Sequence, residues 1–219
     1  PRNHLVWLVG SLARRKPFPF LLDHTLCVTS MDYTTSAHIP SAQHIPIMLI
    51  PDEIPKLNPP DNDKIRLCHS PTNRQLKSTD VFMRAVEEVK KTHPEIELEL
   101  IENKPWKESM AIKSTCHIYL DQLKIGAYGC GAVESWMMGQ PVIVGLNDWV
   151  YSFHPELTEF APKVDEKTVV ERLEKLVTEG ERGGLWMAGN PAADYARRVH
   201  AAENVVRRWE HLVEFVRSR

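Results

Sequence analysis

Two basic residues three positions apart, Arg74 and Lys77, are the first candidates for binding an anion. They lie in HSPTNRQLKSTD (69–80), a polar segment that also contains Asn73 and follows the apolar run IRLCHS (65–70). An arginine presents a planar fork of donors to phosphate oxygens, and a lysine presents a point charge. A basic pair in a loop is more often simply solvated, so its significance depends on where the fold places it.

A glycine-rich loop is the second candidate for an anion site. The segment GAYGCGAVES (126–135) places Gly126, Gly129 and Gly131 between a predicted strand and a predicted helix. Glycine lets the backbone approach a ligand, and the first amides of a helix suit a phosphate. The spacing is not G-x-G-x-x-G, so the dinucleotide-binding fingerprint is absent. A tight turn that packs the helix on the sheet explains these glycines equally well.

One carboxylate, Glu134, stands in the apolar run AVESWMM (132–138). We expect it in the first turn of a helix, where the helix dipole favours negative charge and where a capping acid is common. The alternative is a ligand role. A carboxylate has two acceptor oxygens, which can hold vicinal hydroxyls such as the diol of a ribose.

The hydrophobic pattern predicts the elements that position these residues. Short β-type runs alternate with helical patterns from about residue 65 to residue 180, which is typical of an α/β domain with a doubly wound, Rossmann-like parallel sheet. The predicted strands are 65–70, 96–101, 116–123 and 141–145, and the predicted helices are 78–91, 104–114, 165–179 and a long one over 190–216. Ligands of such sheets bind beyond the carboxyl ends of the strands. The basic pair and the glycine loop should therefore converge at one edge.

The composition excludes several classes of protein. A content of 42% hydrophobic and 26% charged residues is ordinary for a globular chain, and the net charge of −2 gives no general attraction to nucleic acid. No apolar run is long enough to cross a membrane. The four cysteines form no C-x-x-C pair and the ten histidines show no metal-binding spacing. We therefore expect no metal site and reduced thiols in a cytoplasmic protein.

Together these segments resemble a known family. HSPTNRQLKSTD, IELELIENKPWKE (96–108) and IYLDQLKIGAYGCGAVESWMMGQPVIVG (118–145) are similar to the carboxyl-terminal, donor-binding domain of retaining glycosyltransferases with the GT-B fold, in particular group 1, family four. That family carries Glu-Ala-Met-Ala-x-Gly-x-Pro-Val after a glycine-rich loop, where this chain reads ESWMMGQPV (134–142). RRVHAAENVVRRWEHL (197–212) resembles the family's closing helix. The resemblance covers roughly residues 45–216.

The resemblance implies an enzyme that transfers a hexose from a nucleoside diphosphate sugar to a hydroxyl acceptor with retention of configuration. It implies that Arg74 and Lys77 stabilise the departing diphosphate and that Glu134 binds the ribose. The implied donor-binding residues are Asn73, Gly129, Cys130, Gly131 and Glu134. Stabilising a leaving group with preorganised donors is electrostatic catalysis. It implies no cofactor beyond the donor substrate and no protein-bound metal.

The sequence departs from the family at one important position. The family normally carries another Glu eight positions before Glu134, near the transferred sugar, and this chain has Gly126 there. Asp121 lies nearby and is a candidate replacement, although an acid that merely caps the next turn is the commoner case. The alternative function is therefore a truncated, catalytically inactive GT-B descendant that serves as a structural or binding subunit. A sugar-nucleotide epimerase is a third possibility, without assigned acid and base residues.

The resemblance also divides the chain. We expect residues 1–60 to be a partial N-terminal domain with its linker, because PKLNPPDNDK (55–64) has the composition of a boundary. Residues 61–189 would form the nucleotide-sugar-binding domain, and 190–219 a C-terminal helix that packs back on the N-terminal part. Such a chain would be a fragment of a two-domain enzyme or a natural half-protein. In the second case another copy or a partner chain could complete the cleft.

Overall fold

The computed structural model describes residues 5–8, 26–29, 42–60, 63–181 and 190–218. It contains two compact units. The sheet unit is Pro51–Arg197, and the terminal unit combines Pro1–Ile50 with Arg198–Arg219. The division into domains expected from the sequence remains a proposal. Among the described residues, no helix has both the length and the apolar character needed to cross a membrane.

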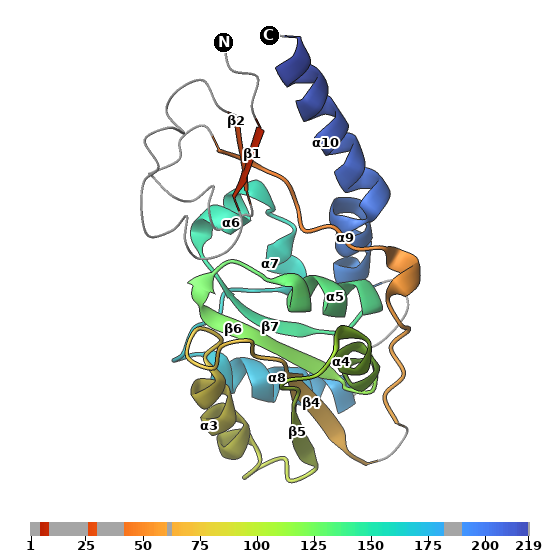
Figure 1. The fold of residues 1–219 in the computed structure, drawn as a ribbon. Helices are drawn as coiled ribbons and strands as arrows, with labels where there is room; N and C mark the ends of the chain where they lie inside the picture. The colour runs from red at the N-terminus through yellow and green to blue at the C-terminus, as the bar shows by residue number, and fades with distance from the viewer. Residues whose placement is uncertain (1–4, 9–25, 30–41, 61–62, 182–189, 219) are drawn as a thin grey trace. The chain divides into compact units, whose positions relative to one another are not determined.

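A four-stranded parallel sheet forms the centre of the sheet unit (Figure 1). Its spatial order is β5 (Ile96–Leu100), β4 (Ile65–His69), β6 (Ile118–Gly126) and β7 (Val142–Leu146). The chain moves from β4 to β5 and then crosses to the other side of β4, so the winding reverses between β4 and β6. This topology confirms the predicted doubly wound α/β sheet. It also places the switch point, where such folds bind ligands, between the loops that follow β4 and β6.

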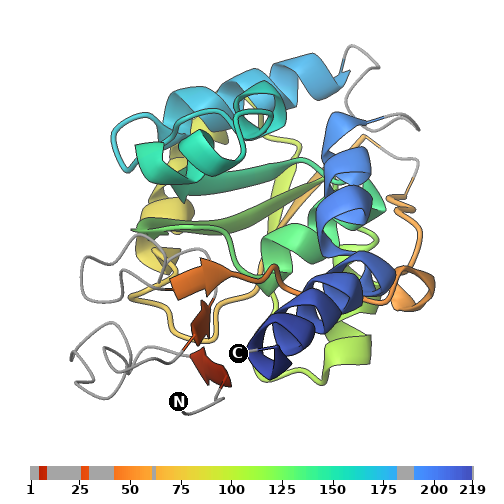
Figure 2. The ribbon, with the colours of Figure 1, turned by 90° about the horizontal axis from the view of Figure 1, so that it is seen from above.

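Helices cover both faces of this sheet. α3 (Thr79–Val89) and α8 (Val169–Glu181) share one apolar core with Ile118 and Leu120 of β6. Because side chains alternate along a strand, Tyr119 and Asp121 point to the opposite face. Two helices lie there, α4 (Trp106–Lys113) and α5 (Cys130–Met138). Figure 2 shows the sheet between α8 and α5.

Shorter elements complete the sheet unit. They are the 3-10 turn η2 (Pro51–Glu53), α6 (Asp148–Phe153), α7 (Leu157–Phe160) and most of α9 (Pro191–His200). α6 follows β7 directly, and the side chain of Asn147 caps it by accepting from the amide of Val150 at 3.0 Å. α9 is tied to the loop before α5 because the phenol groups of Tyr195 and Tyr128 are hydrogen-bonded at 2.9 Å.

The terminal unit has its own parallel sheet, β1 (Leu5–Leu8), β2 (Leu26–Thr29) and β3 (Ala42–His44) in that order. The prediction of one long helix over 190–216 is wrong, because α9 ends at His200 and α10 (Ala202–Arg217) begins two residues later. Ala201 between them is extended and forms a parallel bridge with Leu49. The amide of Leu49 donates to the carbonyl of His200, and the carbonyl of Leu49 accepts from Ala202, both at 2.9 Å. These two bonds replace helical ones.

Candidate functional site

An ion pair at the switch point joins the loop after β4 to strand β6. Lys77, in the loop after β4, donates to Oδ1 of Asp121 on β6 at 2.5 Å. Oδ2 of Asp121 accepts from the backbone amide of Gly129 at 3.1 Å, at the start of α5. Asp121 is completely buried, whereas the Lys77 side chain keeps 15% of its surface exposed. The carboxylate thus lies against an ammonium group and the positive end of a helix.

Asp121 lies beside an irregular part of β6. The strand was expected to end near residue 123, with Asp121 among the polar groups at its end, but it continues to Gly126. Its pairing with β7 shifts register between Leu120 and Gln122. The side chain of Asp121 lies on the same face of the sheet as Tyr119 and reaches the start of α5.

Two glycines allow α5 to approach the sheet closely. A Cβ on Gly131 would lie 2.3 Å from the hydroxyl oxygen of Tyr119, so no larger residue fits without movement. A Cβ on Gly129 would lie 3.2 Å from Nζ of Lys77. Close packing therefore explains Gly131, and Gly129 keeps space around the ammonium group. Cys130 between them is exposed.

Glu134 faces α4 instead of standing in the first turn of α5. α5 begins at Cys130, so Glu134 lies more than one turn inside the helix, and the expected first-turn position is wrong. Its Oε2 accepts from Nζ of Lys113 at 2.7 Å, and its Oε1 accepts from Nε1 of Trp106 at 2.9 Å. A buried ammonium group compensates this carboxylate, which is why an acid persists in so apolar a helix.

Arg74 makes a separate pair on the exposed loop after β4. Its guanidinium donates to both carboxylate oxygens of Glu102, at 2.8 and 2.6 Å. The hydrogen bonds with Glu102 raise the pKa of Arg74, and the same contact lowers the pKa of the Glu102 carboxyl group. Asn73 shapes the loop by accepting from the amide of Leu76 at 2.9 Å. A ligand that engaged Arg74 would have to share it with Glu102.

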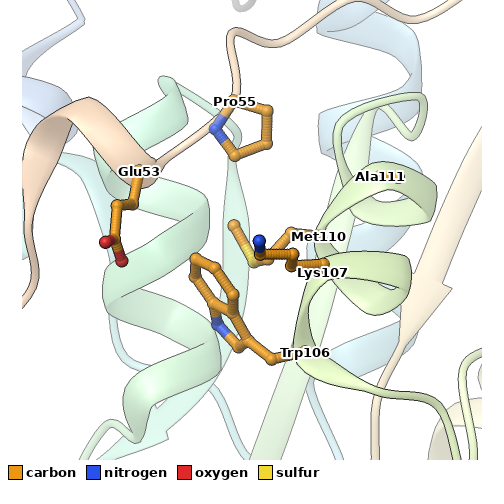
Figure 3. Close-up of a pocket in the computed structure, with 6 residues that line it drawn as sticks. All are labelled: Glu53, Pro55, Trp106, Lys107, Met110 and Ala111. Carbon is orange, nitrogen blue, oxygen red and sulfur yellow. The ribbon is translucent and has the colours of Figure 1, made fainter.

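A pocket of about 510 Å³ lies beside the Trp106–Glu134 contact, between α4 and the segment formed by η2 and the residues after it (Figure 3). Its lining residues are Glu53, Pro55, Trp106, Lys107, Met110 and Ala111. The Trp106 indole is partly exposed here while its N–H binds Glu134. Sequence reasoning overlooked Trp106 and Lys113. The signal that could have found them is the lone acid in an apolar helix, since such an acid requires a buried donor.

Comparison with solved structures identifies the fold. No protein-family model and no curated protein matches the sequence. Sucrose-phosphate synthase from Thermosynechococcus elongatus has a TM-score of 0.65 at 12% identity, over 96% of this chain and 64% of that one. Anabaena HepE in complex with UDP and glucose has a TM-score of 0.62 at 12% identity, over 86% and 62%. A mutant of S. aureus TarM in complex with UDP has a TM-score of 0.58 at 12% identity, over 79% and 39%.

This is the GT-B fold. The resemblance drawn from the motifs is confirmed at this level, and assignment to family four stays a prediction. The chain spans between 39% and 64% of the length of these three neighbours.

Within this GT-B chain the predicted site residues fall into three groups. Lys77, Asp121 and Gly129 meet at the switch point. Glu134 is held one turn away by α4, and Arg74 and Asn73 are engaged on the exposed loop. In the described part of the chain, no cluster of three or more His, Cys, Asp or Glu side chains is arranged to hold a metal ion.

Proposed function

We propose that this chain is the donor-binding part of a glycosyltransferase that moves a hexose from a nucleoside diphosphate sugar to a hydroxyl acceptor with retention. The observation that carries the proposal is the convergence of Lys77 and the Gly129 amide on one carboxylate at the switch point. Donors that hold a carboxylate can hold phosphate oxygens. The structures of HepE and TarM, which contain UDP, support a nucleotide at this fold.

The chemistry follows from charge. When the bond between the sugar and the diphosphate breaks, negative charge grows on the departing oxygen. Lys77 and the amides of Cys130 and Gly131 would stabilise that charge as preorganised donors, which is the usual origin of large electrostatic rate effects. The Gly129 amide would join them by exchanging its hydrogen bond to Asp121 for one to the phosphate. The Asp121 side chain is completely buried, whereas 11% of the Glu134 side chain is exposed. In this proposal Asp121 therefore positions Lys77 and does not touch the sugar.

Glu134 completes the proposed donor site. Each of its oxygens accepts one hydrogen bond from the protein. A carboxylate oxygen has room for a second, so both can still accept a ribose hydroxyl. Arg74 would contribute to the diphosphate only after exchanging part of its contact with Glu102.

Calorimetric titration with UDP, GDP, ADP and their sugar conjugates tests the proposal. Lys77→Ala and Glu134→Gln should each weaken binding of the preferred nucleotide by roughly 1.5–3 kcal/mol, because each removes a contact to a charged group. Lys91→Ala is the matched control, since Lys91 pairs with Glu88 on an exposed surface. A folded protein that binds none of these nucleotides would contradict the proposal.

Two observations favour the second candidate, an inactive binding or structural subunit. Gly126 stands where the family carries its sugar-side acid, and Asp121 already occupies the Gly129 amide that a phosphate would use. The two functions differ in turnover. Nucleotide-sugar binding without release of free nucleoside diphosphate, measured in a coupled assay with and without simple hydroxyl acceptors, would favour the inactive subunit.

A further inference from the structure

We propose that Lys113 is a positioning residue that orients Glu134 for ribose recognition, an inference that rests on the donor-binding function proposed above. Lys113 lies at the end of α4 with 1% of its side chain exposed. Nearly complete burial of an ammonium group is costly unless every proton finds an acceptor. The acceptors of the Lys113 ammonium group therefore indicate the role of this residue.

The Lys113 ammonium group makes three contacts. It donates to Oε2 of Glu134 at 2.7 Å and to the backbone carbonyl of Gly131 at 3.0 Å. It also lies 4.3 Å from the centre of the Tyr119 ring, a favourable distance for a cation over an aromatic face. One ammonium group thus binds both the first turn of α5 and the acid that follows it.

This double contact has a geometric consequence. The first turn of α5 is the proposed diphosphate site, and Glu134 is the proposed ribose site. The ribose and the diphosphate of a nucleotide are separated by a fixed number of bonds. A lysine tied to both the Gly131 carbonyl and the Glu134 carboxylate sets the spacing that this ligand requires.

Trp106 supplies the second constraint. Its indole N–H donates to Oε1 of Glu134, and the ammonium group of Lys113 donates to Oε2. The carboxylate therefore cannot rotate freely. The lone pairs of the Glu134 carboxylate that remain unused are therefore held in fixed orientations. Lys113 also neutralises the charge of Glu134, which would otherwise repel a diphosphate at the same helix.

Ribose selectivity is the readout that separates positioning from a purely structural role. The probes are UDP, GDP and ADP, each beside its 2′-deoxyribose counterpart, and the quantity is the ratio of their Kd values. The wild-type protein should prefer the ribose form of its best nucleotide by about ten- to a hundredfold, the range expected for one hydrogen bond to a charged group. Lys113→Met and Glu134→Gln should both reduce this ratio to about one.

The double variant K113M/E134Q tests whether the two residues act together. If Lys113 works through Glu134, the double variant should show the same ratio as Glu134→Gln alone, because coupled residues are not additive. It also removes both charges of the buried pair, so it keeps the test available if Lys113→Met alone fails to fold. A double variant that regains a ribose preference, or that binds the ribose nucleotide more weakly than Glu134→Gln does, would overturn the inference.

A measurement without nucleotide provides independent support. The indole N–H resonance of Trp106, assigned by its disappearance in Trp106→Phe, should shift in Lys113→Met because the carboxylate it donates to moves. An unchanged resonance, or a ribose preference that survives in Lys113→Met, would overturn the positioning role while leaving the proposed function intact. A wild-type protein that binds none of the nucleotides would instead refute the proposed function, and the inference would fall with it.

Discussion

At the scale of single residues, two buried carboxylates depend on two lysines. Asp121 pairs with Lys77, and Glu134 pairs with Lys113. A buried pair contributes little when intact, yet removing one partner leaves a charge that neither water nor protein satisfies. The two lysines should therefore matter for stability as well as for binding.

Lys77→Met should lower the free energy of unfolding by about 3–5 kcal/mol, because it leaves the completely buried Asp121 without its cation. Lys77→Met combined with Asp121→Asn should recover most of this loss, since an amide at position 121 can still accept from Gly129. Urea unfolding of the two variants and the wild-type protein measures both effects. The exposed Lys91 serves as control through Lys91→Met, which should change stability little. Equal losses in the Lys77 and Lys91 variants would show that burial of Asp121 is not decisive.

At the scale of elements, α5 needs two glycines for different reasons, Gly131 in its first turn and Gly139 at its C-cap. Gly131 leaves no room for a Cβ against Tyr119 of β6, whereas Gly139, which ends the helix, has a φ of 85° and open space around it. The first restriction is steric and the second concerns the backbone. Asparagine tolerates the left-handed conformation better than other residues do.

Asparagine at these two positions should therefore give opposite results. Gly139→Asn should change the melting temperature by only a few degrees, because the left-handed region remains accessible to it. Gly131→Asn should destabilise by about 1–3 kcal/mol or displace α5, because its side chain collides with the Tyr119 hydroxyl. Thermal unfolding followed by circular dichroism makes the comparison. A larger loss at position 139 than at 131 would mean that the helix–sheet contact is looser than described.

At the scale of the whole chain, the sequence predicts what is local and misses what is not. The alternation of strands and helices, the parallel sheet and the glycine loop between β6 and α5 follow from periodicity and turn residues, and they are confirmed. The break at Ala201 depends on Leu49, which lies far away in the sequence, and no helix signal marks it. The contacts of Glu134 were equally hidden, because Trp106 and Lys113 come from another helix. Contacts between residues of different elements can be identified only when the fold is known.

Two histidines with lowered pKa values make the stability of the chain sensitive to mild acid. Burial lowers the pKa of His69 below its usual 6.5, and burial together with the charge of Arg66 does the same for His117. Below pH 6.5 the unfolded chain then binds more protons than the folded one, so stability is complete above that pH and falls as the pH drops toward the folded pKa values. Between pH 7 and pH 5.5 most carboxyl groups do not titrate, so the histidines dominate this window. The free energy of unfolding in urea should decrease over this range. His117→Asn, which keeps an acceptor for the Arg66 amide, should flatten the decrease, and an unaltered slope in that variant would assign the acid sensitivity to other groups.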